Sequence, residues 1–351
     1  MSDRTYKNGL TVVGNATYVL GAMVPASLPI AHATENVSLN ARPLSTNRQL
    51  LRHISSLRNA WTLIFLYLQT IAIMWGAITY PLFGIPIAFV LMGRAHAQFA
   101  SLMHESAHRV LFANKRINDT VGRWLLGFVV FTSTDAYRRV HMAHHRQEFG
   151  PDEPDIALYA NYPITLASFQ RKLVRDATGQ TGIRLLRQQL RGVTSPDARV
   201  RHTLWKMIGV QALLFGICLA LGHWWIYPVL WVLPFLTAWR VINRLRSIAE
   251  HGGLRADSDR RITTHSVRQN WLARFYLVPY NIGFHLAHHV DAGLPFRSLP
   301  RFHRQLLSAG YVADPCLFPK LHSCPQPPRW HPPWPCRRCP TLQPPLMRLQ
   351  T

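Results

Sequence analysis

The feature that most restricts the fold is a charge-free apolar stretch, residues 61–80, which reads WTLIFLYLQTIAIMWGAITY. A helix of this length rises about 30 Å, which matches the thickness of the hydrocarbon core of a bilayer. Pro81 follows directly, and proline interrupts a helix because it lacks a backbone N–H. A second apolar segment covers residues 82–103. We therefore expect a membrane hairpin here rather than two buried helices of a soluble protein.

A second pair of apolar segments, residues 207–222 and 224–239, flanks His223. Each is slightly short for a perpendicular span, so flanking residues have to help it cross. Trp224, Trp225 and Trp239 suit the aromatic belt at a membrane interface. The sequence therefore predicts an all-α membrane protein with four transmembrane helices in two hairpins under a cytoplasmic helical cap. A shorter apolar segment, residues 121–131, cannot span and is expected to be interfacial or re-entrant.

Charge is scarce and one-sided. Charged residues make up only 16% of the chain, against roughly 25% in soluble domains, and Lys+Arg number 39 against 16 Asp+Glu. The basic residues alternate with the apolar segments, which argues against nucleic-acid binding and for a positively charged membrane face. The two short turns, near residues 80–81 and 222–223, contain no Lys or Arg. By the positive-inside rule both hairpins enter from the cytoplasm, and residues 1–56 form a cytoplasmic N-terminal segment.

Histidines gather in three short motifs on the predicted cytoplasmic side: HESAH at residues 104–108, HMAHH at residues 141–145 and HLAHH at residues 285–289. On a helix, residues three or four apart share a face, so each motif directs its imidazoles toward one point. This number of imidazoles exceeds the about four to six ligands of one ion and matches two ions that share a site. The expected ligands are His104, His108, His141, His144, His145, His285, His288 and His289.

Imidazole binds iron, zinc and copper, and two enzyme classes compete for these motifs. Zinc has no redox chemistry, whereas a neutral, nitrogen-rich iron site beside a bilayer suits O₂ activation on an apolar substrate. HESAH also matches HExxH, the signature of zinc metalloproteases, with His104 and His108 as ligands and Glu105 as the base. That alternative leaves the histidines of the other two motifs without a role.

In a di-iron site, Glu105 would instead orient a ligand histidine. The acidic residues that follow the second and third motifs either do the same or belong to a solvated loop; they are Asp152, Glu153, Asp155 and Asp291.

The order of the motifs, with a predicted hairpin between the second and the third, resembles the membrane fatty-acid desaturase family. HESAH corresponds to the first histidine box of that family, HMAHH to the second and HLAHH to the third. The stretch RSIAEHGG resembles the region that supplies an extra histidine, which makes His251 the expected ninth ligand. Asn281 resembles an asparagine that reaches a metal through water in some members. The resemblance covers roughly residues 50–313, and we assign residues 57–313 to one membrane domain.

The resemblance implies an oxidoreductase that uses two non-haem irons and O₂ on a lipid acyl chain, most simply a fatty-acid desaturase. Related boxes occur in alkane hydroxylases, carotenoid ketolases and sphingolipid-modifying enzymes, so a hydroxylase or ketolase stays open. Electrons have to come from outside, because the sequence contains no flavin, haem or convincing iron–sulfur motif. A basic cytoplasmic face suits an acidic donor such as a ferredoxin or a cytochrome b5-like protein, and it suits anionic membrane lipids as well. A non-enzymatic metal-binding or transport protein would place its ligands within the spans, whereas these lie outside.

The last segment, residues 314–351, differs from the rest in composition. It is dense in proline, which disfavours helix, and we expect it to be disordered. A zinc or rubredoxin-like knot is the alternative, although the glycines that a tight metal-binding turn uses are missing. Its ligands would be Cys324, His331, Cys336 and Cys339.

Overall fold

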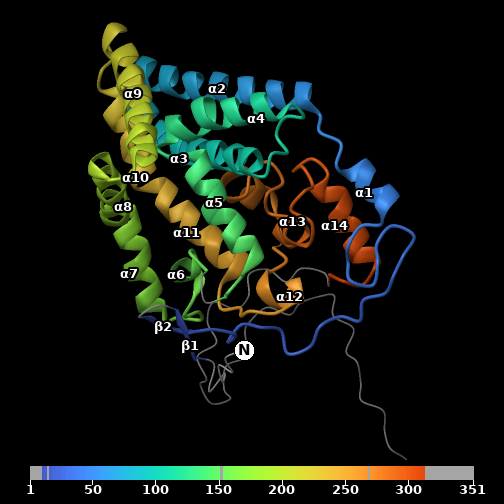
Figure 1. Ribbon diagram of the computed structural model, residues 1–351. Helices are drawn as coiled ribbons and strands as arrows, with labels where there is room; N and C mark the ends of the chain where they lie inside the picture. The colour runs from blue at the N-terminus through green and yellow to red at the C-terminus, as the bar shows by residue number, and fades with distance from the viewer. Residues whose placement is uncertain (1–9, 14–15, 151–152, 268, 313–351) are drawn as a thin grey trace, which may run out of the picture.

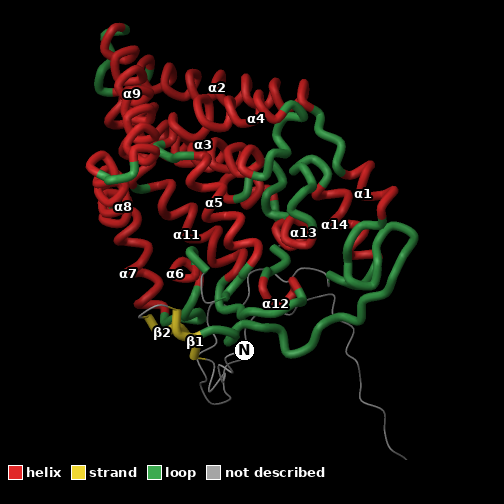
Figure 2. The backbone as a smooth tube through the Cα atoms, viewed as in Figure 1, coloured by secondary structure: helices red, strands yellow, loops and turns green. Residues whose placement is uncertain are grey.

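The computed structural model describes residues 10–13, 16–150, 153–267 and 269–312. Helices dominate this part of the chain, and the strands β1 (Leu10–Val13) and β2 (Ala16–Val19) form one antiparallel pair near its N-terminal end (Figure 2). The proline- and cysteine-rich tail and Asp152 lie outside the described residues, so the expectations for them stay predictions.

The first two long helices are α2 (Ser56–Thr79) and α3 (Pro81–Ala107), which lie side by side (Figure 1). Pro81 is the first residue of α3, where its missing N–H has no helical partner to lose. The helices approach closely beside the turn, because a Cβ atom on Gly84 would lie 2.7 Å from the carbonyl oxygen of Gly76. The break between the helices thus falls where the sequence predicted it.

Three helices in the described part of the chain are long and apolar enough to cross a membrane: Ser45–Thr79, Pro81–Ala107 and Ala198–Ala220, the last of which is α9. Their outward side chains are strongly apolar. Phe65 and Trp75 on α2 and Leu213 on α9 each leave more than half of their surface exposed. Water disfavours a continuous surface of this kind, whereas lipid tails cover it, so these helices fit a membrane protein.

The fourth predicted span does not form one continuous helix. The structure divides residues 227–251 into a π-helix η4 (Tyr227–Val232), α10 (Leu233–Leu236) and α11 (Ala238–His251). Pro228 and Pro234 lack the N–H that a regular ladder needs, and Thr237 leaves the helical region with φ −123° and ψ −84°. None of the three pieces is long enough to span by itself. Residues 227–251 are therefore a broken helical segment, and a fourth span at this place stays a prediction.

The short apolar segment at residues 121–131 is irregular and only partly buried, because Leu126 and Phe128 are buried whereas Trp124 and Leu125 are exposed. It consists of α4 (Lys115–Val121), a π-helix η1 (Gly122–Gly127) and a 3₁₀ turn η2 (Phe128–Val130). Irregular turns leave carbonyl groups without helical partners. Gln211 Nε2 donates to the carbonyl of Phe128 at 2.6 Å, and Trp231 Nε1 donates to that of Val129 at 2.9 Å. α9 and η4 thus supply donors that the segment needs, and its interfacial or re-entrant placement stays a prediction.

Among the remaining helices, α5 and α11 pack against α3. Figure 1 shows α5 and α11 running through the middle of the molecule, with α13 and α14 beside them. The elements are α1 (Ser45–Leu51), α5 (Thr134–Arg146), α6 (Ile156–Tyr159), α7 (Leu166–Ala177), α8 (Gln180–Leu190), η3 (Arg191–Thr194), α12 (Arg260–Thr263), η5 (Ala273–Leu277), α13 (His285–Val290) and α14 (Leu299–Ser308).

The described part of the N-terminal segment is attached to the helices that carry the third histidine motif. Asn47 of α1 exchanges two side-chain hydrogen bonds with Gln305 of α14. Arg48 forms an ion pair with Asp291, which directly follows α13. Leu51 is buried in a small apolar cluster with Leu286 and other side chains of this region. The segment therefore helps to hold α13 in place.

Candidate metal centre

The first histidine motif lies at the end of α3. His104 is in the last turn of that helix and His108 caps it, so the two imidazoles sit on one face with ring centroids 4.7 Å apart. The Nε2 atoms of both rings are buried and have no hydrogen-bond partner in the described structure. A buried ring nitrogen without a partner is costly unless it binds something, such as a metal ion.

Two other helices complete the first group of histidines. On α5, the Nε2 atoms of His141 and His145 lie 3.1 Å apart. His288 of α13 brings its Nε2 within 3.1 Å of the Nε2 of His145. Together with His104 and His108, these residues place one ring nitrogen each within 4.8 Å of all the others.

The second group adjoins the first and draws on the same two helices together with α11. His144, His251 and His289 place their ring nitrogens within 4.8 Å of one another. His285 joins them, because its Nε2 lies 3.0 Å from the Nε2 of His251 and 3.0 Å from that of His289. The rings of His145 and His289 stack with centroids 4.3 Å apart, so the two groups share a border.

These distances fit metal coordination. Two imidazole nitrogens bound at right angles to an ion at about 2.1 Å would lie about 3.0 Å apart. The close Nε2 pairs have this separation of 3.0–3.1 Å. Two adjoining groups of nitrogen donors therefore suit two ions that share one site.

Burial also sets the charge of these rings. It lowers the pKa of His141, His251 and His285 well below the usual range, so these imidazoles are neutral at neutral pH, the form that binds metal. His144 differs. Burial alone would lower its pKa, but the hydrogen-bonded carboxylate of Glu153 raises it.

Oxygen acceptors hold the opposite nitrogens of several rings. Glu153 accepts from Nδ1 of His144 at 3.0 Å, Glu148 accepts from Nδ1 of His289 at 2.6 Å, and the carbonyl of Thr263 accepts from Nδ1 of His251 at 2.9 Å. The three hydrogen bonds fix the tautomer and the direction of a ligand ring. With Nδ1 held in this way, the Nε2 atoms are the ones that face the shared site. Glu250 Oε1 lies 3.6 Å from Nδ1 of His285, which is too long for a hydrogen bond, and acts on that ring through its charge.

The predicted orienting carboxylates divide into those that touch a histidine and those that do not. Glu153 contacts His144, as described above. Glu105 lies 3.3 Å from Nδ1 of His104 and accepts the backbone N–H of Phe296 at 2.8 Å. Because Glu105 is buried and already bonded, it is poorly placed to act as the base of a zinc protease. Asp155 lines the cavity beside the histidines, whereas Asp291 pairs with Arg48 instead.

Sequence reasoning missed Glu148, Glu250 and the Thr263 carbonyl. Glu148 lies three residues after His145, and Glu250 lies directly before His251, so a search for carboxylates within one helical turn of each histidine would have found both. The Thr263 carbonyl belongs to the backbone, so no residue type in the sequence points to it.

Asn281 makes its contacts elsewhere. Its side-chain amide nitrogen lies 3.4 Å from the Phe296 carbonyl and its oxygen lies 3.5 Å from Arg274, so the expected link to a metal through water stays a prediction.

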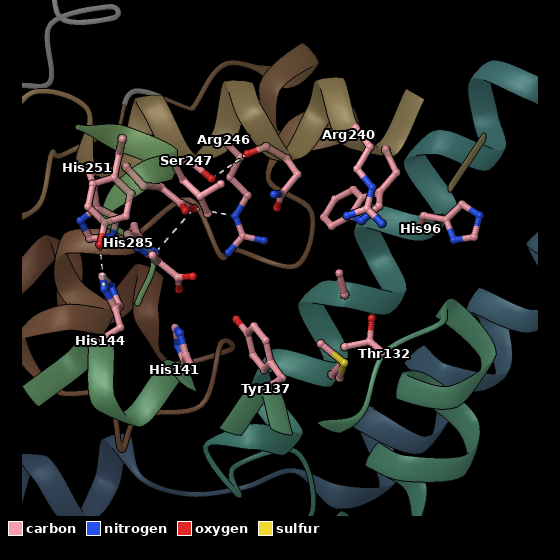
Figure 3. A pocket seen from close by; sticks show the side chains of 18 of the residues that line it. His96, Thr132, Tyr137, His141, His144, Arg240, Arg246, Ser247, His251 and His285 are labelled. Carbon is pink, nitrogen blue, oxygen red and sulfur yellow. Dashed lines mark hydrogen bonds and ion pairs between the residues drawn. The ribbon is translucent and has the colours of Figure 1, made fainter. Parts of the chain in front are cut away.

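A cavity of about 270 Å³ opens beside the second group of histidines (Figure 3). His141, His144, His251 and His285 form one end of it. Tyr137 and Arg246 extend into it from opposite walls (Figure 3). The arrangement places a substrate-sized space directly against the candidate metal centre.

Comparisons with known proteins identify the family. The chain matches the family described as fatty acid desaturase over residues 79–314, which is more than half of its length and includes every histidine of both groups. It is 25% identical over 226 residues to dihydrorhizobitoxine desaturase of Bradyrhizobium elkanii, covering 60% of this chain and 64% of that protein. It is 23% identical over 271 residues to sn-1 oleoyl-lipid 12-desaturase of Anabaena variabilis, covering 69% of this chain and 74% of that protein. The chain thus spans slightly less than two thirds of the first relative's length. It belongs to the fatty acid desaturase family of membrane oxidoreductases.

Proposed function

We propose that this protein binds two iron ions and uses O₂ to desaturate an aliphatic chain, most simply the acyl chain of a lipid or fatty acid. The observation that carries the proposal is the pair of adjoining histidine groups at one end of a cavity. The proposed ligands are the nine histidines of these groups. Bound iron would supply the one-electron chemistry that lets O₂ oxidise an unactivated C–H bond.

The protein side chains have three tasks in this proposal. The carboxylates Glu148 and Glu153 hold ligand imidazoles in one orientation through their Nδ1 atoms. The cavity walls position two neighbouring methylene groups against the site and keep bulk water away. Removal of two hydrogens, with reduction of O₂ to two waters, also consumes two electrons and two protons, which an external donor has to deliver. An excess of Lys+Arg (39 against 16 Asp+Glu) favours an acidic electron-transfer protein such as a ferredoxin or a cytochrome b5-like protein.

Hydroxylation is the second candidate reaction, because it begins with the same hydrogen removal and differs only in the fate of the carbon radical. Both relatives carry desaturase in their names, which favours desaturation. Their named substrates differ, since one name refers to an oleoyl lipid and the other to dihydrorhizobitoxine.

The decisive test is lipid profiling of cells that express the protein, compared with cells that express His144→Ala. We expect new double bonds in the wild-type sample alone, because His144 belongs to the second histidine group. Hydroxylated products in the wild-type sample would support the second candidate. An unchanged profile from protein with two bound irons would argue against an acyl-lipid substrate.

We also propose that α9 and the broken segment after it form a second membrane hairpin, with the metal centre facing the cytoplasm. The reason is that both turns between long apolar segments lack Lys and Arg. In a variant without native cysteines, a cysteine at position 80 or 223 should react with a membrane-impermeant reagent from outside. A cysteine at position 146 should react only after the membrane is opened. The reverse pattern would place the electron donor on the other side as well.

A further inference from the structure

The cavity beside the histidines is not a simple hydrocarbon tunnel. One face of α11 lines it with polar side chains spaced three to four residues apart, from Arg240 through Asn243 and Ser247 to Glu250 and His251. The other walls mix apolar and polar side chains, among them Ala100, Met103, Val130, Leu158, Thr132, Tyr137 and Asp155. Several of these side chains already bond within the protein, Glu250 to Arg246, Ser247 to the Asn243 carbonyl and His251 to the Thr263 carbonyl, so a polar substrate group would be met by a side chain that is left without a partner.

Arg240 is the charged group on this face that has no ion pair among the described residues. The neighbouring arginines of α11 are paired, Arg244 with Asp176 and Arg246 with Glu250. Arg240 has no ion pair and no side-chain hydrogen bond among the described residues, and its Nε is buried. Its guanidinium lies over the ring of Phe235, at 4.3 Å from the centroid, and the carboxylate of Asp176, which pairs with Arg244, acts on it only through its charge.

An arginine side chain stays protonated in proteins, so Arg240 places a permanent positive charge in the cavity wall. Partial burial of such a charge without an anion is unfavourable. A carboxylate matches the guanidinium group in charge and in the geometry of its two oxygens. Figure 3 shows Arg240 at the end of the cavity near His96, with Arg246 between it and the histidine groups.

The inner end of the cavity is closed. His96 Nε2 lies 3.0 Å from the carbonyl oxygen of Trp231, and the rings of these two residues are in contact. Trp231 also packs edge-on against Phe99. Beyond this wall lies a separate, apolar cavity of about 470 Å³, which Phe99 and Trp231 line from the other side. A long alkyl chain entering beside the histidines would therefore stop at His96 and Trp231.

We propose that the substrate carries a free carboxylate that Arg240 binds at the closed end of this cavity, with a short carbon chain reaching back toward the metal centre. This inference rests on the proposed oxidation at the two histidine groups. Arg240 and His251 are eleven residues apart on α11, which corresponds to about 16 Å along the helix axis. The oxidised carbon atoms are therefore several bonds away from the carboxylate. The cavity volume of 270 Å³ lies just below the range of roughly 300–1,000 Å³ for drug-sized ligands, which suits a short acid.

The test compares octanoate with octanamide, which has the same chain and a neutral head. Binding of each to the purified, iron-containing protein is measured by calorimetry, and iron content is measured on the same sample. We expect octanoate to bind about tenfold or more tightly than octanamide, because a charge-assisted hydrogen bond is lost with the amide. In Arg240→Gln the two ligands should bind within about twofold of each other, whereas Arg240→Lys should keep part of the preference because it keeps the charge. Arg187→Gln, on the exposed side of α8, is the matched control and should behave as the wild type.

Three results would overturn the inference. The first is equal binding of the two ligands to wild-type protein that contains its iron, which leaves the oxidation proposal standing. The second is an octanoate preference that survives in Arg240→Gln. The third is a preference seen in phosphatidylcholine nanodiscs that disappears when phosphatidylglycerol is added, since Arg240 would then bind a lipid phosphate. Protein that lacks iron but still prefers octanoate would contradict the oxidation proposal and leave the carboxylate site standing.

Discussion

Replacing His288 with alanine is expected to lower bound iron from about two ions per chain to about one or fewer and to abolish turnover. His288 is fully buried at the centre of the first histidine group. Its Nε2 lies 3.1 Å from that of His145, and its ring centroid lies 4.6 Å from those of His104 and His108. Alanine removes a donor that no neighbouring side chain replaces. Elemental analysis and product formation, measured on the same preparation, check the prediction.

Two further variants make this experiment specific. His251→Ala removes a ligand of the second group and should also lower iron content, through the other ion. His202→Ala is the control, because His202 is an exposed residue of α9 outside both groups, and iron and turnover should stay at wild-type values. One zinc ion per chain, with activity intact after His288→Ala, would defeat the di-iron proposal.

Replacing Glu148 with alanine is expected to weaken metal binding by about 10- to 100-fold, although Glu148 is not itself a proposed ligand. Its buried carboxylate accepts from Nδ1 of His289 at 2.6 Å and forms an ion pair with Arg260. Alanine would free the His289 ring to rotate and would leave Arg260 without its anion. Retention of iron during competition with a chelator measures the effect directly.

A positioning role for Glu148 can be separated from a merely structural one. Glu148→Gln keeps an oxygen that can accept from His289, so it should recover much of the iron retention that Glu148→Ala loses. The visible or Mössbauer spectrum of the bound iron should change in Glu148→Ala even where the thermal unfolding temperature does not. Glu35→Ala, at an exposed position, is the matched control. Equal iron retention in Glu148→Ala and the wild type would show that the His289 ring needs no such support.

Much of this protein could be predicted from local spacing. The apolar stretch at residues 61–80 and the break at Pro81 depend on neighbouring residues alone, so α2 and α3 were predicted where they occur. The i, i+3 and i+4 spacing within each histidine motif likewise fixes which imidazoles share a face. The family could be inferred because the order of these motifs along the chain is itself a sequence property.

What only the tertiary structure decided depends on contacts between residues far apart in the chain. The interruptions within residues 227–251 were not predicted, because mean hydropathy does not register how Pro228, Pro234 and Thr237 interrupt the ladder. The role of the Glu148 carboxylate depends on its hydrogen bond with His289, which is 141 residues away in the sequence. Arg240 stands out only when its neighbours on α11 are seen to be paired and its own side chain is not. The sequence by itself determines which residues share one face of a helix. Helix packing decides which partner a side chain contacts and whether it has one.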